Sequence, residues 1–187
     1  QNVGGTISMS AGVSATATGG SVTVASGAGT ATTSGAIEIR SHDAGDAGVS
    51  GGVALRSGTS SEGTSGSFNI STGRATGGTG GGITIAVGGG DSGVGGNIRA
   101  VAGVSATLTG GAVRIESGYG TATTSGAIQL ASANSGEEGA SGNIALSTGT
   151  ASSGDTGTIT IQSGQSTFGK GGSIALGVGS GDVGSGG

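Results

Sequence analysis

The sequence predicts an all-β fold, a parallel β-solenoid (β-helix) of twelve 15-residue repeats that form two modules of 91 residues. Two observations predict this fold. First, the pattern Gly, any residue, aliphatic, any residue, aliphatic recurs along the whole chain at a nearly constant spacing. Second, the octapeptide TATTSGAI occurs at residues 30–37 and again at residues 121–128, at an offset of 91 residues. Recurrence at fixed periods is typical of solenoids and other repeat architectures.

The short repeat is built around two aliphatic positions that are separated by one residue. Successive first positions are fifteen residues apart, except for two intervals of sixteen that end at Val53 and Ile144. Such alternation predicts a strand with one buried face, and equivalent strands of stacked coils lie about 4.7–4.9 Å apart. The expected core ladder consists of the first aliphatic positions: Ile7, Val22, Ile37, Val53, Phe68, Ile83, Ile98, Val113, Ile128, Ile144, Ile159 and Ile174. An alternative is a 30-residue coil in which two Ile-bearing strands face each other across the core.

The long repeat divides one continuous solenoid into two modules. Residues 1–4 are expected to be the tail end of a preceding repeat, residues 5–95 the first module of six repeats, and residues 96–187 the second module of six. The third repeat of each module has one extra residue, near residues 41–50 and 132–141, which we expect to form a bulge or a widened corner. Because no capping repeat is recognisable, we expect a longer array or copies stacked end to end.

The composition limits the possible classes of protein. The chain has 49 glycines among 187 residues and lacks Pro and Cys. Glycine and serine at this level are also typical of flexible linkers, but the regular spacing of the aliphatic residues favours an ordered chain. The net charge of −4 argues against a nucleic-acid partner. No apolar run is long enough to predict a membrane span, and without Cys there is no disulfide or thiolate metal site.

Two glycine-rich stretches partly match known ligand-binding motifs. GQSTFGKG at residues 164–171 matches the start of a P-loop, but Gly171 stands where the motif needs Ser or Thr to bind magnesium. The stretches around Asp91 and Asp182 are similar to calcium-binding nonapeptide repeats, but the repeat here is longer than nine residues and no ladder of carboxylates accompanies them. We therefore expect no metal and no cofactor at either place.

The titratable residues also predict no catalytic site. The only histidine, His42, is close in sequence to Asp43 and Asp46, but there is no Cys and no second His for a catalytic triad or a metal site. We interpret these residues and Glu137–Glu138 as solvated corner residues. The expectation is a protein that is not an enzyme.

Two surface properties are suggested by the polar residues. Asn69-Ile70-Ser71 is an N-glycosylation sequon, and Asn69 should point outward because it lies between two aliphatic positions. The high Ser and Thr content raises an ice-binding hypothesis. However, the residue between the two aliphatic positions varies along the chain and includes Glu38, Arg99 and Arg114, which is irregular for a flat threonine face.

The stretch SGAIQLASANSGEEGASGNIALSTGTASSGDTGTITI, residues 125–161, resembles the glycine-rich tandem-repeat β-solenoid proteins of microbial cell surfaces and secreted fibres. The resemblance extends over the whole chain as a pattern. It implies an extracellular or cell-surface protein with a structural or adhesive role, and it assigns no catalytic residue.

Three functions are therefore expected, in this order. The first is a structural protein that forms a stiff extracellular rod or a self-assembling filament, with its own copies as partners, end to end or laterally. The second is an adhesin stalk or a glycan-binding surface, with a polysaccharide as partner. The third is an ice-binding protein.

Overall fold

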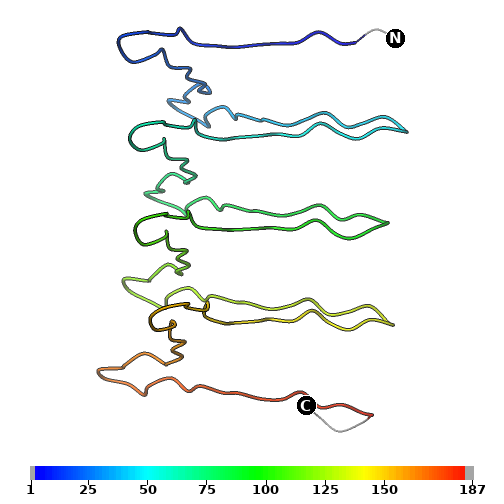
Figure 1. Ribbon diagram of the computed structural model, residues 1–187, viewed down its shortest axis with the longest axis vertical. Helices are drawn as coiled ribbons and strands as arrows, with labels where there is room; N and C mark the ends of the chain where they lie inside the picture. The colour runs from blue at the N-terminus through cyan, green and yellow to red at the C-terminus, as the bar shows by residue number, and fades with distance from the viewer. Residues whose placement is uncertain (1–2, 184–187) are drawn as a thin grey trace. The chain divides into compact units, whose positions relative to one another are not determined.

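The computed structural model describes residues 3–183 of the chain. Within that range the backbone has no helix and no β-strand, and it alternates between extended stretches and short bends (Figure 1). The all-β prediction is therefore wrong: residues 3–183 form neither the 15-residue coils nor the alternative 30-residue coils of a solenoid. Gln1 and Asn2 of the expected preceding repeat, and residues 184–187 at the end of the second module, lie outside the described residues.

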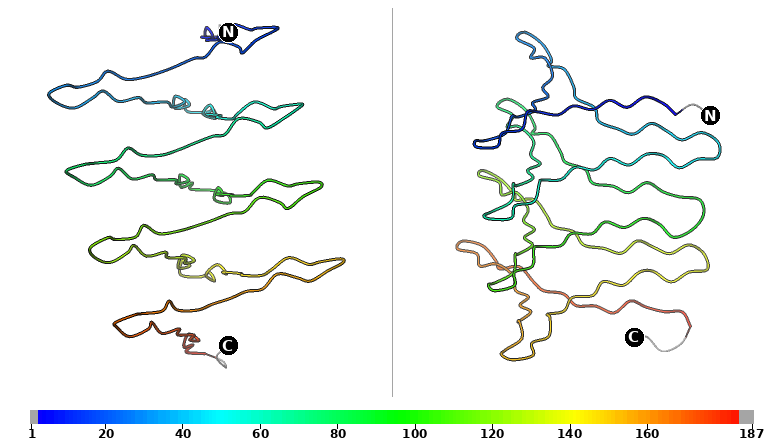
Figure 2. Two further views of the ribbon diagram at one scale, coloured as in Figure 1. Left: turned by 90° about the vertical axis from the view of Figure 1, so that its left-hand side faces the viewer. Right: turned by 45° about the horizontal axis from the view of Figure 1, so that its top comes forward.

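The backbone hydrogen bonds of residues 3–183 are not those of a solenoid. A β-solenoid needs each strand to pair with the equivalent strand of the next coil. In residues 3–183 five backbone N–H groups donate to backbone carbonyls, and their partners are three or eight residues away in the chain. A folded domain has about one hydrogen bond per residue, of which about two-thirds join backbone groups. Within residues 3–96 and within residues 97–183, extended segments that run close together in Figure 1 are separated in Figure 2, so they are not paired.

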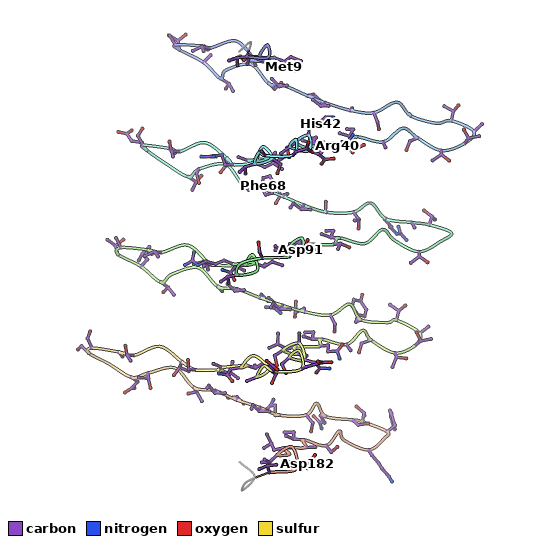
Figure 3. The ribbon with its side chains drawn as sticks, turned by 90° about the vertical axis from the view of Figure 1, so that its right-hand side faces the viewer. Met9, Arg40, His42, Phe68, Asp91 and Asp182 are labelled. Carbon is purple, nitrogen blue, oxygen red and sulfur yellow. The ribbon has the colours of Figure 1, made fainter. Side chains whose placement is uncertain are left out.

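The expected core ladder is not buried. Eleven of its twelve residues have exposed fractions between 47% at Ile159 and 62% at Ile98, and Ile7 is 92% exposed. Residues 3–183 contain no buried side chain. Figure 3 shows two residues of the aliphatic positions, Met9 and Phe68, on separate extended segments. Each repeat has two aliphatic positions among small residues, and in the single chain these positions stay exposed instead of packing into a core.

The repeats do share a local structure, a loop that brings a Ser, Thr, Ala or Val side chain next to a glycine. The first residue of the loop lies two positions after the second aliphatic position, and we call it the closing residue; its place in the repeat is the closing position. The last residue of the loop is the first glycine of the next repeat, and we call it the leading glycine. A Cβ atom on the leading glycine would lie 2.7–3.7 Å from the closing side chain in all eleven described loops of this kind. The pairs are Ala11 with Gly20, Ser26 with Gly35, Ser41 with Gly51, Ser57 with Gly66, Thr72 with Gly81, Val87 with Gly96, Ala102 with Gly111, Ser117 with Gly126, Ser132 with Gly142, Thr148 with Gly157 and Ser163 with Gly172.

The closing position is also where the chain is least exposed. Ala11, Ser41 and Ala102 are the half-buried residues of the range 3–183, and all three are closing residues. The extra residue of the third repeat lies inside the loop, because Ser41 and Gly51 are ten residues apart whereas the closing pairs of the shorter repeats are nine apart.

Several loops have the same hydrogen bonds in both modules. In the first loop of each module, the Oγ atoms of Ser14 and Ser105 accept hydrogen bonds from the amides of Ala17 and Leu108, both at 3.0 Å. The two loops occupy equivalent positions of the two modules. The duplication in the sequence is thus reproduced in the local geometry of the loops.

Three loops contain a glycine with positive φ: Gly63 at 96°, Gly93 at 87° and Gly154 at 112°. Side chains other than glycine reach this region at a cost of about 1–2 kcal/mol. We expect Gly154→Ala to disorder its loop, observed as altered backbone coupling constants and faster amide exchange over residues 150–157. Gly149→Ala is the matched control, because a Cβ atom there meets no atom within 4 Å and its φ is not positive. If the coupling constants and amide exchange rates of residues 150–157 were the same in the two variants, the expectation would be wrong.

The contacts of the chain fall into two parts, Gln1–Gly96 and Asn97–Gly187. The boundary lies one residue after the boundary between the two sequence modules. The part of the chain that the structure describes contains no helix that could cross a membrane.

Candidate functional site

Residues 3–183 form no cavity, and no group of three or more His, Asp or Glu side chains in that range is placed to hold a metal ion. The chemistry of this chain must therefore be sought on its open surface. His42, Asp91 and Asp182 are all exposed on that surface.

The loop that matches the P-loop pattern has a different geometry. A P-loop presents free backbone amides to a phosphate at the start of a helix. Here the amide of Gly169 donates to Ser166 Oγ at 2.9 Å, and no helix follows in the described chain. Phe168 in the middle of the loop is fully exposed. This arrangement does not form a phosphate cradle.

The titratable candidates are not brought together. His42 lies two residues from Arg40 on one segment, and Asp91 lies apart from both in the same part of the chain (Figure 3). Asp182 belongs to the other part. Glu137 and Glu138 form an exposed turn of their own.

Asn69 is exposed on an extended stretch, as an acceptor of a glycan would have to be. Its side-chain Nδ2 donates to Ser67 Oγ at 3.5 Å. The two residues share one side of the backbone, since residues i and i+2 of an extended chain point the same way. Glycosylation of Asn69 stays a prediction.

Two ion pairs show the same alternation on the extended segments. Arg40 Nε lies 3.0 Å from Glu38 Oε1, and Arg114 Nη2 lies 2.6 Å from Glu116 Oε1. Each pair spans two residues, so its members lie on the side opposite the aliphatic positions. Each segment has an aliphatic face, formed by the two aliphatic positions. The residues between and after them form the opposite face, which we call the polar face because most of these residues are polar or charged.

The aliphatic face recurs in every repeat, and its residues are exposed in the single chain. Beyond the ladder residues, the second aliphatic positions are also exposed, for example Ile39 at 69% and Leu130 at 78%. Monomeric proteins rarely expose contiguous apolar patches of more than a few hundred Å². This face is the best candidate for a functional surface of the described chain.

The hydrogen bond between Arg114 and Glu116 affects the pKa of both side chains. The hydrogen bond to Arg114 lowers the pKa of Glu116, and the same bond raises the pKa of Arg114. Because the hydrogen bond to Arg114 lowers the pKa of Glu116, the pair stabilises the extended segment above the ordinary pKa of glutamate, and this stabilisation is lost as the pH falls through the lowered pKa. The pair is exposed, so its contribution is small.

Removing the guanidinium is expected to return the pKa of Glu116 to its ordinary range. A carboxyl-detected NMR titration of wild type and Arg114→Gln measures this directly. Arg99→Gln, which removes another arginine of the same part, is the control and should leave the titration of Glu116 unchanged. An unchanged titration in Arg114→Gln would show that the ion pair does not form.

Sequence reasoning did not identify the loop closures or the two ion pairs. Both have a signal in the sequence. A Ser, Thr, Ala or Val lies nine or ten positions before the leading glycine of each of the eleven loops, and opposite charges lie two positions apart on an extended segment. The chain matches no protein-family model, no curated protein and no solved structure.

Proposed function

We propose that this chain is a structural repeat protein that self-assembles, and that further copies of the chain cover its aliphatic faces. One observation carries the proposal. The accessible surface is 18492 Å², whereas a compact monomer of this mass exposes about 7,600 Å². The isolated chain thus leaves uncovered the apolar area that normally drives folding.

The unpaired backbone supports the same proposal. Extended segments with free N–H and C=O groups are templates for pairing with another chain. All twelve repeats have the same alternation of aliphatic and small or polar residues, so any segment of one copy is similar to many segments of another. Other copies of the chain therefore supply the largest number of matching segments for it to pair with.

Three features of the sequence favour association of copies, and the third of them favours an ordered assembly. The chain has no Pro to interrupt backbone pairing. Its net charge is only −4, which opposes association weakly. The repeats have nearly constant length, so many segments can pair at once and each pairing adds to the same assembly. An extracellular or cell-surface location is part of the proposal and is supported by the resemblance to glycine-rich repeat proteins.

Sedimentation velocity over a range of concentrations, followed by electron microscopy of the same samples, tests the proposal. We expect a monomer at low concentration and uniform rods or filaments above a threshold. A monodisperse monomer at every concentration would contradict the proposal. Selective retention of that monomer on a polysaccharide would instead support the adhesin or glycan-binding function.

A further inference from the structure

We propose that the segment 37–41 of one copy pairs, parallel and in register, with the segment 113–117 of a second copy, and that the two ion pairs join into a network of four charges. This inference rests on the proposed self-assembly. It specifies which segments of two copies pair and whether they run parallel or antiparallel.

The order of the charges is the first argument. The first segment has Glu38 before Arg40, and the second has Arg114 before Glu116. If the segments run parallel with Ile37 beside Val113, each acid lies beside a base. Opposite charges that face each other on neighbouring strands stabilise the pairing, and like charges destabilise it.

The aliphatic residues fit the same register, which is the second argument. Ile37 then lies beside Val113 and Ile39 beside Ile115, so both aliphatic positions meet their equivalents. The closing residues Ser41 and Ser117 and the leading glycines Gly35 and Gly111 are also aligned.

Other arrangements of these segments satisfy fewer of the groups. An antiparallel pairing of the two segments on the same residues places acid beside acid and base beside base. A parallel pairing of segment 37–41 with its own copy does the same. An antiparallel pairing of that segment with its own copy, centred on Ile39, matches the charges but places Ile37 beside Ser41. The parallel pairing of the two different segments alone matches both the charges and the aliphatic positions.

The charges are available for this pairing. The side chains of Glu38 and Arg40 are 74% and 68% exposed, and those of Arg114 and Glu116 are 79% and 64% exposed. Neighbouring strands lie about 4.7–4.9 Å apart, so each charged group can contact its partner across the strands while it keeps its neighbour along the strand.

Reversal of each ion pair provides the test. The variant E38R/R40E and the variant R114E/E116R each keep an ion pair within its own segment, but each places like charges opposite each other between segments. We expect either variant to raise the threshold concentration for assembly about tenfold. The variant with all four substitutions restores every contact and should assemble like wild type.

Mixing the two reversed variants shows whether the contact joins different copies. In an equimolar mixture, the reversed segment of one variant is complementary to the reversed segment of the other, so the mixture should assemble near the wild-type threshold. If the contact lay within one chain, mixing would not rescue assembly, and the proposal would be wrong. If E38R/R40E assembled at the wild-type threshold without the second variant, the proposed pairing would be wrong. The antiparallel pairing of segment 37–41 with the same segment of another copy would then be favoured.

Wild-type protein in the same experiment separates the two levels of the proposal. If wild type and both reversed variants assemble at the same threshold, this pairing is wrong but the proposed self-assembly stands. Wild type that stays monomeric at all concentrations overturns both.

Discussion

Replacing Ile83 with Asp is expected to raise the threshold concentration for assembly by about 100-fold, because burial of an isoleucine side chain contributes about 1.5–3 kcal/mol. A carboxylate on a covered face must also lose its hydration or become protonated. Ile83 is 54% exposed in the single chain, so the substitution changes little before association. Sedimentation of the variant over a concentration series measures the threshold.

Thr84→Asp is the matched control for this experiment. It introduces the same charge at the next residue, which lies on the polar face of the same segment. We expect its threshold to stay within a few-fold of wild type. If both variants assembled equally well, the aliphatic face would not be the surface that copies of the chain cover.

Replacing Gly29 with Ala is expected to open the loop 27–35 and to increase amide exchange at Gly35 about tenfold or more. In the structure the Gly35 amide donates to the carbonyl of Gly27 at 2.9 Å. A Cβ atom on Gly29 would lie 2.5 Å from the carbonyl oxygen of Thr33 and 2.6 Å from that of Thr32. Both are backbone atoms, so the loop cannot relax by rotating a side chain. Loss of one backbone hydrogen bond is worth about 0.5–1.5 kcal/mol, up to tenfold in the exchange rate, and backbone strain adds to it.

Gly27→Ala in the same loop is the control, because a Cβ atom there meets no atom within 4 Å. The equivalent experiment in the second module compares Gly120→Ala with Gly118→Ala, since a Cβ atom on Gly120 would lie 2.6 Å from the carbonyl oxygen of Thr124. Hydrogen exchange followed by NMR reads both loops. Unchanged protection of Gly35 in Gly29→Ala would contradict the loop geometry.

The two copies of the octapeptide TATTSGAI lie in equivalent loops of the two modules. Its two copies belong to loops closed by the same backbone bond, at 2.9 Å for Gly35 to Gly27 and 2.8 Å for Gly126 to Gly118. In both loops, a glycine lies against threonine carbonyls where no Cβ atom fits. The two copies of the octapeptide therefore belong to loops of closely similar geometry.

The extended segments could be predicted from the sequence, but the loop closures and the tertiary structure could not. The alternation of Ile37 and Ile39 with Glu38 and Arg40 indicates an extended segment, and the ion pair on one side confirms that geometry. Alternation of residues does not specify the neighbour of a segment, because the repeats are nearly equivalent partners for one another. The prediction of a solenoid assumed that the neighbour is the next repeat of the same chain, and the structure contradicts that assumption.

The candidate surface could be read from the sequence only in part. The aliphatic positions were identified, but they were expected inside a core, whereas residues such as Ile128 and Ile174 are more than half exposed. The reversed order of charges at Glu38–Arg40 and Arg114–Glu116 has meaning only once both pairs are known to lie on extended segments.

Hydrogen exchange of the wild-type chain as a function of concentration tests the central claim most directly. The claim is that a single chain has no core and that its extended segments gain their partners from other copies. Amides of segments such as 82–86 and 158–162 are predicted to exchange without protection in dilute monomer and to become protected above the assembly threshold. Strong protection of these amides in a monomer at the lowest concentration would contradict the claim, because the segments would then be paired within one chain.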